Sequence, residues 1–177
     1  MELDPDVGAV IFSLDNSFTH QKLLLASLYI REKGVPLIVT NDDVVDMVKG
    51  KRFPGAGSTL ASVLAACNLK KGERVDSCSK YEPGTYDVIG KPNPFMFELL
   101  KEEHNIPENS RSLMIGDRPN TDIHFGKSVG IDQCLVFSGV VNNLEDLEEN
   151  WLTESQANYD PTYYMDKIGT FQKAGED

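Results

Sequence analysis

The chain has 177 residues, of which 40% are apolar and 25% are charged, and its formal net charge is -11 at pH 7. This length suits one domain or two small ones, and the composition is that of an ordinary globular protein. The surplus of acid disfavours nucleic acid and anionic membrane surfaces as partners, and no apolar run reaches the roughly 18 residues of a membrane-spanning helix.

Strand-like and helix-like patterns alternate from the start of the chain. Residues 8–14 (GAVIFSL) form a short apolar run that predicts a buried strand. Residues 18–34 carry apolar side chains at helical spacing and end at a glycine, which predicts a helix. Residues 35–40 (VPLIVT) predict a second strand, followed by the polar residues of the sequence TNDD.

The middle of the chain combines one clear helix with its most loop-like segment. The Gly/Pro loop at residues 54–58 (PGAGS) opens a helix that we expect to reach about Cys67, with Ser58 as its N-cap. Residues 70–87 are rich in loop-forming types and are expected to connect two structural units.

The second half repeats the alternation of strands and helices. Asn93 is expected to cap a helix with Pro94 at its first position, and Thr121 to cap another. The remaining expected elements are strands at 88–90, 112–116, 133–137 and 162–165, and helices at 121–130 and 144–152. Strands that alternate with helices pair in parallel, so the predicted fold class is α/β.

Lys91, Asp117 and Asp122 follow two of the predicted strands, and we expect these strands to finish at one edge of a single sheet. Ligands of open parallel sheets bind beyond the carboxyl ends of the strands. Asp117 would hold Mg²⁺ through oxygen, Lys91 would neutralise phosphate charge, and Asp122 would orient either group. Each residue alone also has a structural explanation, as a turn former, a first-turn acid or a solvated lysine.

The segments GKPNPFMFE (90–98) and MIGDRPNTDI (114–123) resemble the haloacid dehalogenase (HAD) superfamily. Within it, the chain looks most like the phosphatases of phosphoglycolate, pyridoxal phosphate and 4-nitrophenyl phosphate. Other matching segments are DPDVGAVIFSLDNSFTHQKL, TNDD, PGAGS, FSGV and PTYYMDKI. The resemblance implies a phosphomonoester hydrolase that uses Mg²⁺ and forms an aspartyl-phosphate, a covalent intermediate that divides one difficult displacement into two easier ones.

By position, the resemblance assigns three residues to the catalytic centre. Lys91 matches the lysine that holds the phosphoryl group, Asp117 matches a Mg²⁺ ligand, and Asp122 matches the second acid of the same motif. The expected substrate is a small phosphorylated metabolite, with phosphoglycolate, glycerol phosphate, pyridoxal phosphate and aryl phosphates all open. The substrate-binding positions implied in the cap domain are Asn41, Asp43, Gly55 and Gly57.

The resemblance also implies a domain organisation. Residues 1–86 would form part of an α/β cap of the C2 type, and residues 87–177 the C-terminal half of a Rossmann-like core with helices flanking a parallel sheet. A homodimer through the cap or an exposed sheet edge is a further expectation. The three cysteines are odd in number and unpatterned, which favours reduced thiols and a cytoplasmic location.

The nucleophile motif of the family is an apolar strand followed by Asp-x-Asp, and this chain does not show it. Asp4-Pro-Asp6 precedes its strand. We therefore expect the chain to begin within the cap and to be inactive or impaired. Two alternatives stay open: a non-catalytic scaffold descended from a phosphatase, and a minimal enzyme that uses Asp15, which follows an apolar strand but has Ser17 in place of the second acid.

Overall fold

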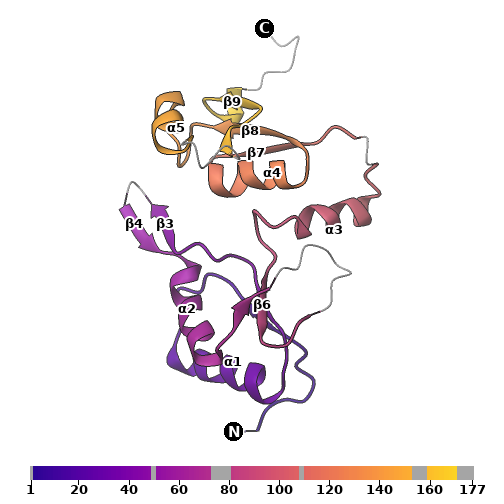
Figure 1. Cartoon of the computed structure of the whole chain (residues 1–177). Helices are drawn as coiled ribbons and strands as arrows, with labels where there is room; N and C mark the ends of the chain where they lie inside the picture. The colour runs from indigo at the N-terminus through magenta and orange to yellow at the C-terminus, as the bar shows by residue number, and fades with distance from the viewer. Residues whose placement is uncertain (1, 49–50, 73–80, 108–109, 153–158, 171–177) are drawn as a thin grey trace. The chain divides into compact units, whose positions relative to one another are not determined.

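The computed structural model describes residues 2–48, 51–72, 81–107, 110–152 and 159–170. Contacts within the chain divide it into two compact units, Met1–Leu99 and Leu100–Asp177 (Figure 1). Each unit contains a parallel sheet and helices, which confirms the α/β class. The assignment of residues 1–86 to a cap and 87–177 to a core stays a prediction.

The sheet of the first unit has four parallel strands in the order β1-β2-β6-β5. β1 and β2 are the predicted strands in shorter form, and β6 lies largely within the predicted loop at 70–87, of which residues 73–80 lie outside the described part of the chain. The four strands are β1 (Val10–Phe12), β2 (Leu37–Val39), β5 (Lys70–Lys71) and β6 (Thr85–Val88).

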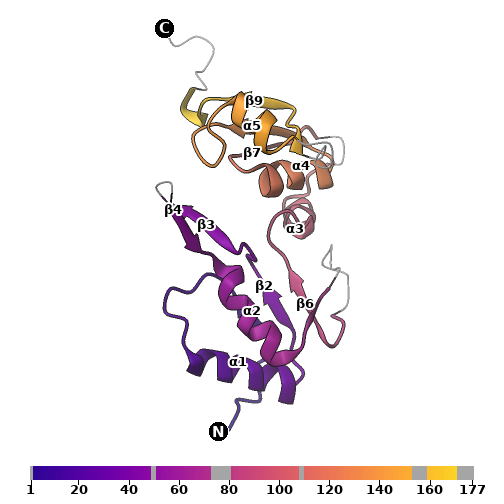
Figure 2. The same cartoon turned by 60° about the vertical axis from the view of Figure 1, so that its left-hand side comes forward.

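Helices α1 (His20–Glu32) and α2 (Ala56–Cys67) pack against each other (Figure 2). Their buried side chains form one apolar core with those of this sheet. Strand residues alternate between the two faces of a sheet. Phe12 is buried in this core, while its neighbour Ile11 is 71% exposed. The core residues are Phe12, Ile30, Leu37, Val39, Ala56, Leu60, Val63, Tyr86 and Val88.

The helix starts of the first unit confirm one part of the sequence interpretation and correct another. The predicted N-cap at Ser58 is wrong, because α2 already begins at Ala56, after Gly55. The Ser58 hydroxyl instead donates to the Gly55 carbonyl within the first turn, at 2.7 Å. The side chain of Asn93 does serve a helix start: its Oδ1 accepts from Phe95 N at 2.8 Å, where α3 (Phe95–His104) begins.

A two-stranded antiparallel hairpin was not predicted. It consists of β3 (Val45–Val48) and β4 (Lys51–Pro54). All four residues of β4 are exposed, including Phe53 at 47%. The hairpin lies between β2 and α2 in the sequence, so it separates the two predicted binding segments of the first unit.

The sheet of the second unit has three parallel strands in the order β7-β8-β9. These strands, β7 (Leu113–Gly116), β8 (Asp132–Val136) and β9 (Tyr163–Met165), confirm the three strands predicted there. Ile123, Leu135, Val141 and Leu147 form the buried core of this unit.

The helical segments of the second unit are short. The predicted helix at 121–130 is a π-helical turn, η1 (Pro119–Ile123), followed by α4 (His124–Ser128). Thr121 therefore lies inside η1, and its predicted role as an N-cap is wrong. The other two segments are α5 (Leu144–Asn150), capped by the side chain of Asn143, and the 3-10 turn η3 (Ile168–Thr170).

One expectation about the sheet is corrected. β6 hydrogen-bonds to β2 on one side and to β5 on the other, whereas β7 pairs with β8 in a separate sheet. Both edges of β6 are therefore used within the first unit, and the strands before Lys91 and Asp117 do not share one sheet.

None of the helices in the described ranges is long and apolar enough to cross a membrane. Cys67 and Cys134 are free thiols, and Cys78 lies outside the described residues.

Candidate functional site

The loop after β2 holds two of the predicted substrate-binding residues. Asn41 Oδ1 accepts a hydrogen bond from Asp43 N at 2.7 Å, which closes a tight turn beyond the carboxyl end of the strand. Asp42, between them, forms an ion pair with Lys71 at 2.8 Å. The turn thus has a fixed backbone, and a β5 lysine neutralises one of its acids.

Gly55 and Gly57, the other two predicted residues, lie against this loop. Gly55 N donates to Val44 O at 2.9 Å, and Gly57 N donates to Asp43 O at 2.8 Å. A Cβ atom on Gly55 or Gly57 would collide with the backbone carbonyl oxygen of Asp43 or Asp42, respectively. Glycine is required here because two backbones approach closely. The structure therefore brings all four predicted residues together, and their role in binding substrate stays a prediction.

Lys91 follows β6 by three residues and is exposed. The preceding Gly90 lies against the same loop, since a Cβ atom there would collide with the carbonyl oxygen of Thr40. The backbone that carries the Lys91 side chain therefore passes close to the carboxyl end of β2. Lys91 belongs to the first unit and Asp117 to the second, so their predicted meeting stays a prediction.

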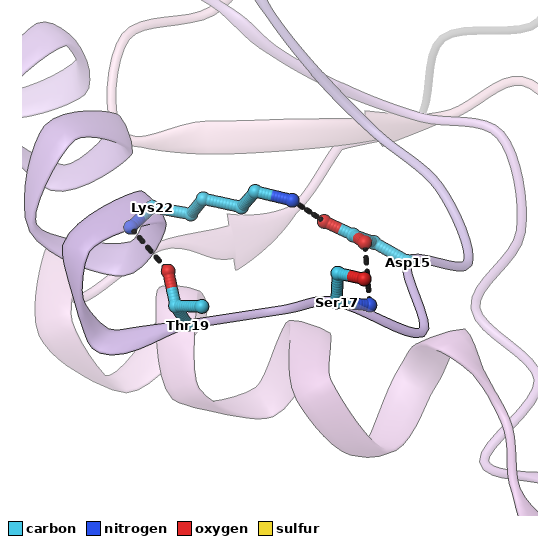
Figure 3. A network of polar contacts seen from close by, with 4 residues as sticks. All are labelled: Asp15, Ser17, Thr19 and Lys22. Carbon is cyan, nitrogen blue, oxygen red and sulfur yellow. Dashed lines mark hydrogen bonds and ion pairs between the residues drawn. The ribbon is translucent and has the colours of Figure 1, made fainter.

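Asp15, the alternative nucleophile, lies in the loop between β1 and α1 and is engaged on both oxygens (Figure 3). Oδ2 pairs with Lys22 Nζ at 2.6 Å, and Oδ1 accepts from Ser17 N at 2.8 Å. The hydrogen bond from Lys22, then that from Ser17, lowers the pKa of Asp15. Held in this way, the Asp15 carboxylate has a structural role in the loop before α1. The N-cap of this helix is Thr19, whose Oγ1 accepts from Lys22 N at 3.2 Å.

Asp15 also lines an open hollow of about 440 Å³ in the first unit. The hollow lies between the β1–α1 loop, the β3–β4 hairpin and the start of α2, and Gly55 forms part of its wall. Leu14, Phe53 and Pro54 make much of the lining apolar. The minimal-enzyme alternative would need Asp15 to release Lys22 before it could attack a substrate there.

In the second unit, Asp117 lies directly beyond β7. Its Oδ2 accepts a hydrogen bond from Val140 N at 2.9 Å, and Val140 lies in the loop after the neighbouring strand β8. Gly139 packs so closely on Asp117 that a Cβ atom would collide with its carboxylate. Among the described residues Oδ1 of Asp117 has no hydrogen-bond partner, so one oxygen is fixed by the fold and the other can bind a ligand.

Asp122 has a different environment, because it is turned into the fold and only 4% exposed. Its Oδ2 accepts from Arg118 N at 3.1 Å, and its own N donates to Arg118 O at 2.9 Å. Gly116 lies against its side chain, where a Cβ atom would collide with the carboxyl group. Asp122 therefore closes the turn that follows Asp117.

Sequence reasoning did not identify the backbone N–H of Val140, the close packing of Gly139 or the buried amide oxygen of Asn120. Asn120 is part of η1, and its Oδ1 is a buried atom with no hydrogen-bond partner in the described part of the chain. The segment FSGV (137–140) was part of the family pattern, but a backbone donor leaves no signal in residue type. No group of three or more His, Cys, Asp and Glu side chains that could hold a metal occurs among the described residues.

Comparisons with known proteins agree with the resemblance in the sequence. The HAD-hydrolase-like family model matches residues 88–171. Chronophin from Mus musculus is 32% identical over 175 residues, which cover 98% of this chain and 54% of chronophin. The chain thus spans about half the length of the curated relatives it matches.

Two solved structures share the fold. The 4-nitrophenylphosphatase from Thermotoga maritima is 28% identical, with a TM-score of 0.68 over 93% of this chain and 54% of that one. Glycerol phosphate phosphatase from Mycobacterium tuberculosis, solved in complex with magnesium, is 24% identical, with a TM-score of 0.67 over 91% of this chain and 41% of that one. Its likeness shows the fold alone. Residues 88–171 thus match the HAD-like hydrolase family, and the proteins that the chain resembles in sequence and fold include phosphatases.

Proposed function

We propose that this protein acts in Mg²⁺-dependent hydrolysis of phosphomonoesters, with its cation site at Asp117. One observation carries the proposal: Asp117 lies directly beyond a parallel strand, with one oxygen fixed by Val140 N and the other open among the described residues. This is the position at which open α/β sheets bind their ligands. The match of residues 88–171 to the HAD-like hydrolases supports the same reaction class.

The residues present fit Mg²⁺. This ion prefers oxygen ligands, keeps several of its waters, and is often held by one or two carboxylates together with a substrate phosphate. Asp117 supplies one such carboxylate, and the buried Oδ1 of Asn120 is a further oxygen without a partner in the described ranges. When bound, the ion would neutralise the negative charge that develops on a phosphoryl group during transfer.

Lys91 and Asp122 would have different functions. The exposed ammonium group of Lys91 would bind the phosphoryl oxygens and offset their charge. Asp122 is buried and holds Arg118 N, so it would position the turn that carries Asp117 rather than reach the substrate. This positioning function agrees with the assignment of Asp122 as the second acid of the motif that contains Asp117.

The glycine-supported loop of the first unit would select the substrate. Asn41 and Asp43 lie in a turn whose backbone accepts hydrogen bonds from the N–H groups of Gly55 and Gly57. Polar side chains on such a fixed turn suit the hydroxyl or amine groups of a small phosphorylated metabolite. The solved relative 4-nitrophenylphosphatase makes aryl phosphates the first compounds to test.

The experiment is an assay of 4-nitrophenyl phosphate hydrolysis by the 177-residue chain, with and without Mg²⁺. Because the chain shows no Asp-x-Asp nucleophile motif after an apolar strand, we expect only weak turnover, which requires Mg²⁺, is lost in Asp117→Asn and persists in Asp15→Asn. Turnover that is unchanged in Asp117→Asn contradicts the proposed site. Turnover that is lost in Asp15→Asn identifies Asp15 as the nucleophile. Absence of turnover, with folded protein, contradicts hydrolysis by this chain and favours the scaffold alternative.

A further inference from the structure

Asn120 is the polar residue whose environment the fold leaves unexplained. Its Oδ1 is shielded from solvent and has no hydrogen-bond partner among the described residues. Buried polar atoms in native proteins are almost always paired, and the exceptions indicate strain, function, or a water or ion that belongs there. A buried amide oxygen, with two lone pairs and no donor, requires such an explanation.

The turn that carries Asn120 is tightly fixed. Asp122 joins it to Arg118 by two hydrogen bonds, at 2.9 Å between Asp122 N and Arg118 O and at 3.1 Å between Arg118 N and Asp122 Oδ2. Pro119 and Ile123, at its two ends, are buried. π-helical turns are rare and occur often at functional sites. The side chain of Asn120 therefore projects from a constrained backbone only three residues after Asp117.

We propose that Asn120 is a positioning residue of the cation site: its Oδ1 accepts a hydrogen bond from a water molecule bound to the divalent cation at Asp117. This inference rests on the proposed cation site. Waters on Mg²⁺ are strong donors, and Mg²⁺ usually keeps several of them. An acceptor held at a fixed place beyond the ligand would order these waters, as outer-shell partners do at other metal sites.

The test measures cation affinity without turnover. Mn²⁺ binding to the full 177-residue chain is followed by electron paramagnetic resonance, and Mg²⁺ is then added as a competitor. Loss of an outer-shell partner typically weakens metal binding about 10- to 100-fold, and we expect a change of about 10-fold in Asn120→Ala. Asn120→Asp keeps an oxygen acceptor and should bind at least as tightly as the wild type.

Two further variants separate this role from a general effect on folding. Asn143→Ala removes the same side chain from the N-cap of α5, where Oδ1 accepts from Asp146 N at 2.8 Å. It should lower stability and leave the Mn²⁺ affinity unchanged. Asn120→Leu fills a similar volume without a polar atom, so it should fold even if the alanine variant does not, and it should also lose affinity.

Unchanged Mn²⁺ affinity in folded Asn120→Ala and Asn120→Leu overturns the inference and assigns the buried oxygen to an ordinary structural water. Asp117→Asn distinguishes this result from failure of the proposed function. If Asp117→Asn abolishes binding and the Asn120 variants do not, only the role of Asn120 falls. If the wild type binds no Mn²⁺, or Asp117→Asn binds it normally, both proposals fall.

Discussion

The two units place polar residues at the carboxyl ends of parallel strands by different physical means. In the first unit, the turn of Asn41 and Asp43 is supported by backbone contacts at Gly55 and Gly57. In the second, Asp117 accepts a hydrogen bond from the backbone of another loop, and Asp122 closes the turn that follows.

This difference has consequences for mutation. A site built on close backbone approach is sensitive to added atoms, because a backbone carbonyl cannot move aside cheaply. A site built on carboxylates that accept backbone N–H groups is sensitive to lost acceptors, because a buried donor is then left unpaired. The first unit should therefore respond most to substitution of its glycines, and the second to substitution of its acids.

Gly57→Ala should have the largest effect on stability. The new Cβ atom would collide with the carbonyl oxygen of Asp42, and overpacking of this kind typically costs about 1–3 kcal/mol, with the upper end expected at a backbone contact. Urea unfolding followed by far-ultraviolet circular dichroism measures the loss. Gly8→Ala is the matched control, because a Cβ atom there meets nothing within 4 Å. Equal stability of the two variants would refute the backbone-contact explanation.

Asp122→Ala should come next, with a loss of about 1–3 kcal/mol from the unpaired N–H of Arg118. Trp151, which packs against the core of the second unit, reports its unfolding by fluorescence. The control is Asp132→Ala, whose carboxylate pairs with Arg111 at 3.6 Å and whose side chain is 39% exposed. Exposed ion pairs contribute about 0–1 kcal/mol to stability. A similar loss in both variants would therefore contradict the claim that the hydrogen bond from Arg118 N to Asp122 stabilises the fold more than an exposed ion pair does.

Gly139→Ala should change cation binding more than stability. Its Cβ atom would displace the carboxylate of Asp117, while Gly139 itself lies in an exposed part of the loop. We expect Mn²⁺ affinity to fall about 10-fold, as for other changes that shift a ligand. Gly169→Ala, with open space around its Cβ position, should bind as the wild type does. Unaltered affinity in Gly139→Ala would show that this contact does not orient Asp117.

The smallest effect is expected at the exposed pair of Asp15 and Lys22. Lys22→Met should raise the pKa of Asp15, because the hydrogen bond from Lys22 is the main cause of its lowered value. A carboxyl with a lowered pKa stabilises the fold above its ordinary pKa of 3.8, and this contribution is lost as pH falls through the lowered value. Titration of Asp15 by nuclear magnetic resonance, with Lys33→Met as the control, measures the shift. An unchanged pKa in Lys22→Met contradicts the pairing.

The order of elements could be predicted from the sequence because buried parallel strands and amphipathic helices leave local patterns. β7, β8 and β9 appear as apolar runs of the expected length. The hairpin β3–β4 left no such pattern, since its second strand is exposed along its whole length. Thr121 was misplaced because a π-helical turn begins earlier than an α-helix capped by that residue would.

The limits of sequence reasoning at the site are also physical. The residue types of Asp117 and Asn41 indicated their regions, because polar groups after buried strands are visible in the sequence. Pairing between strands is not local, so the separation of β6 from β7 into two sheets could not be predicted. The donor to Asp117 is a backbone N–H, which every residue except proline carries.

The account depends on a divalent cation that binds at Asp117 and holds a phosphate group beside it. The most direct measurement is the line width of the ³¹P resonance of inorganic phosphate in the presence of the chain and Mn²⁺. A paramagnetic ion broadens the signal of a phosphate bound beside it. We predict broadening in the wild type and in the control Asp132→Asn, whose carboxylate pairs with Arg111, and none beyond that of free Mn²⁺ in Asp117→Asn. Broadening that persists in Asp117→Asn contradicts a cation site at this residue.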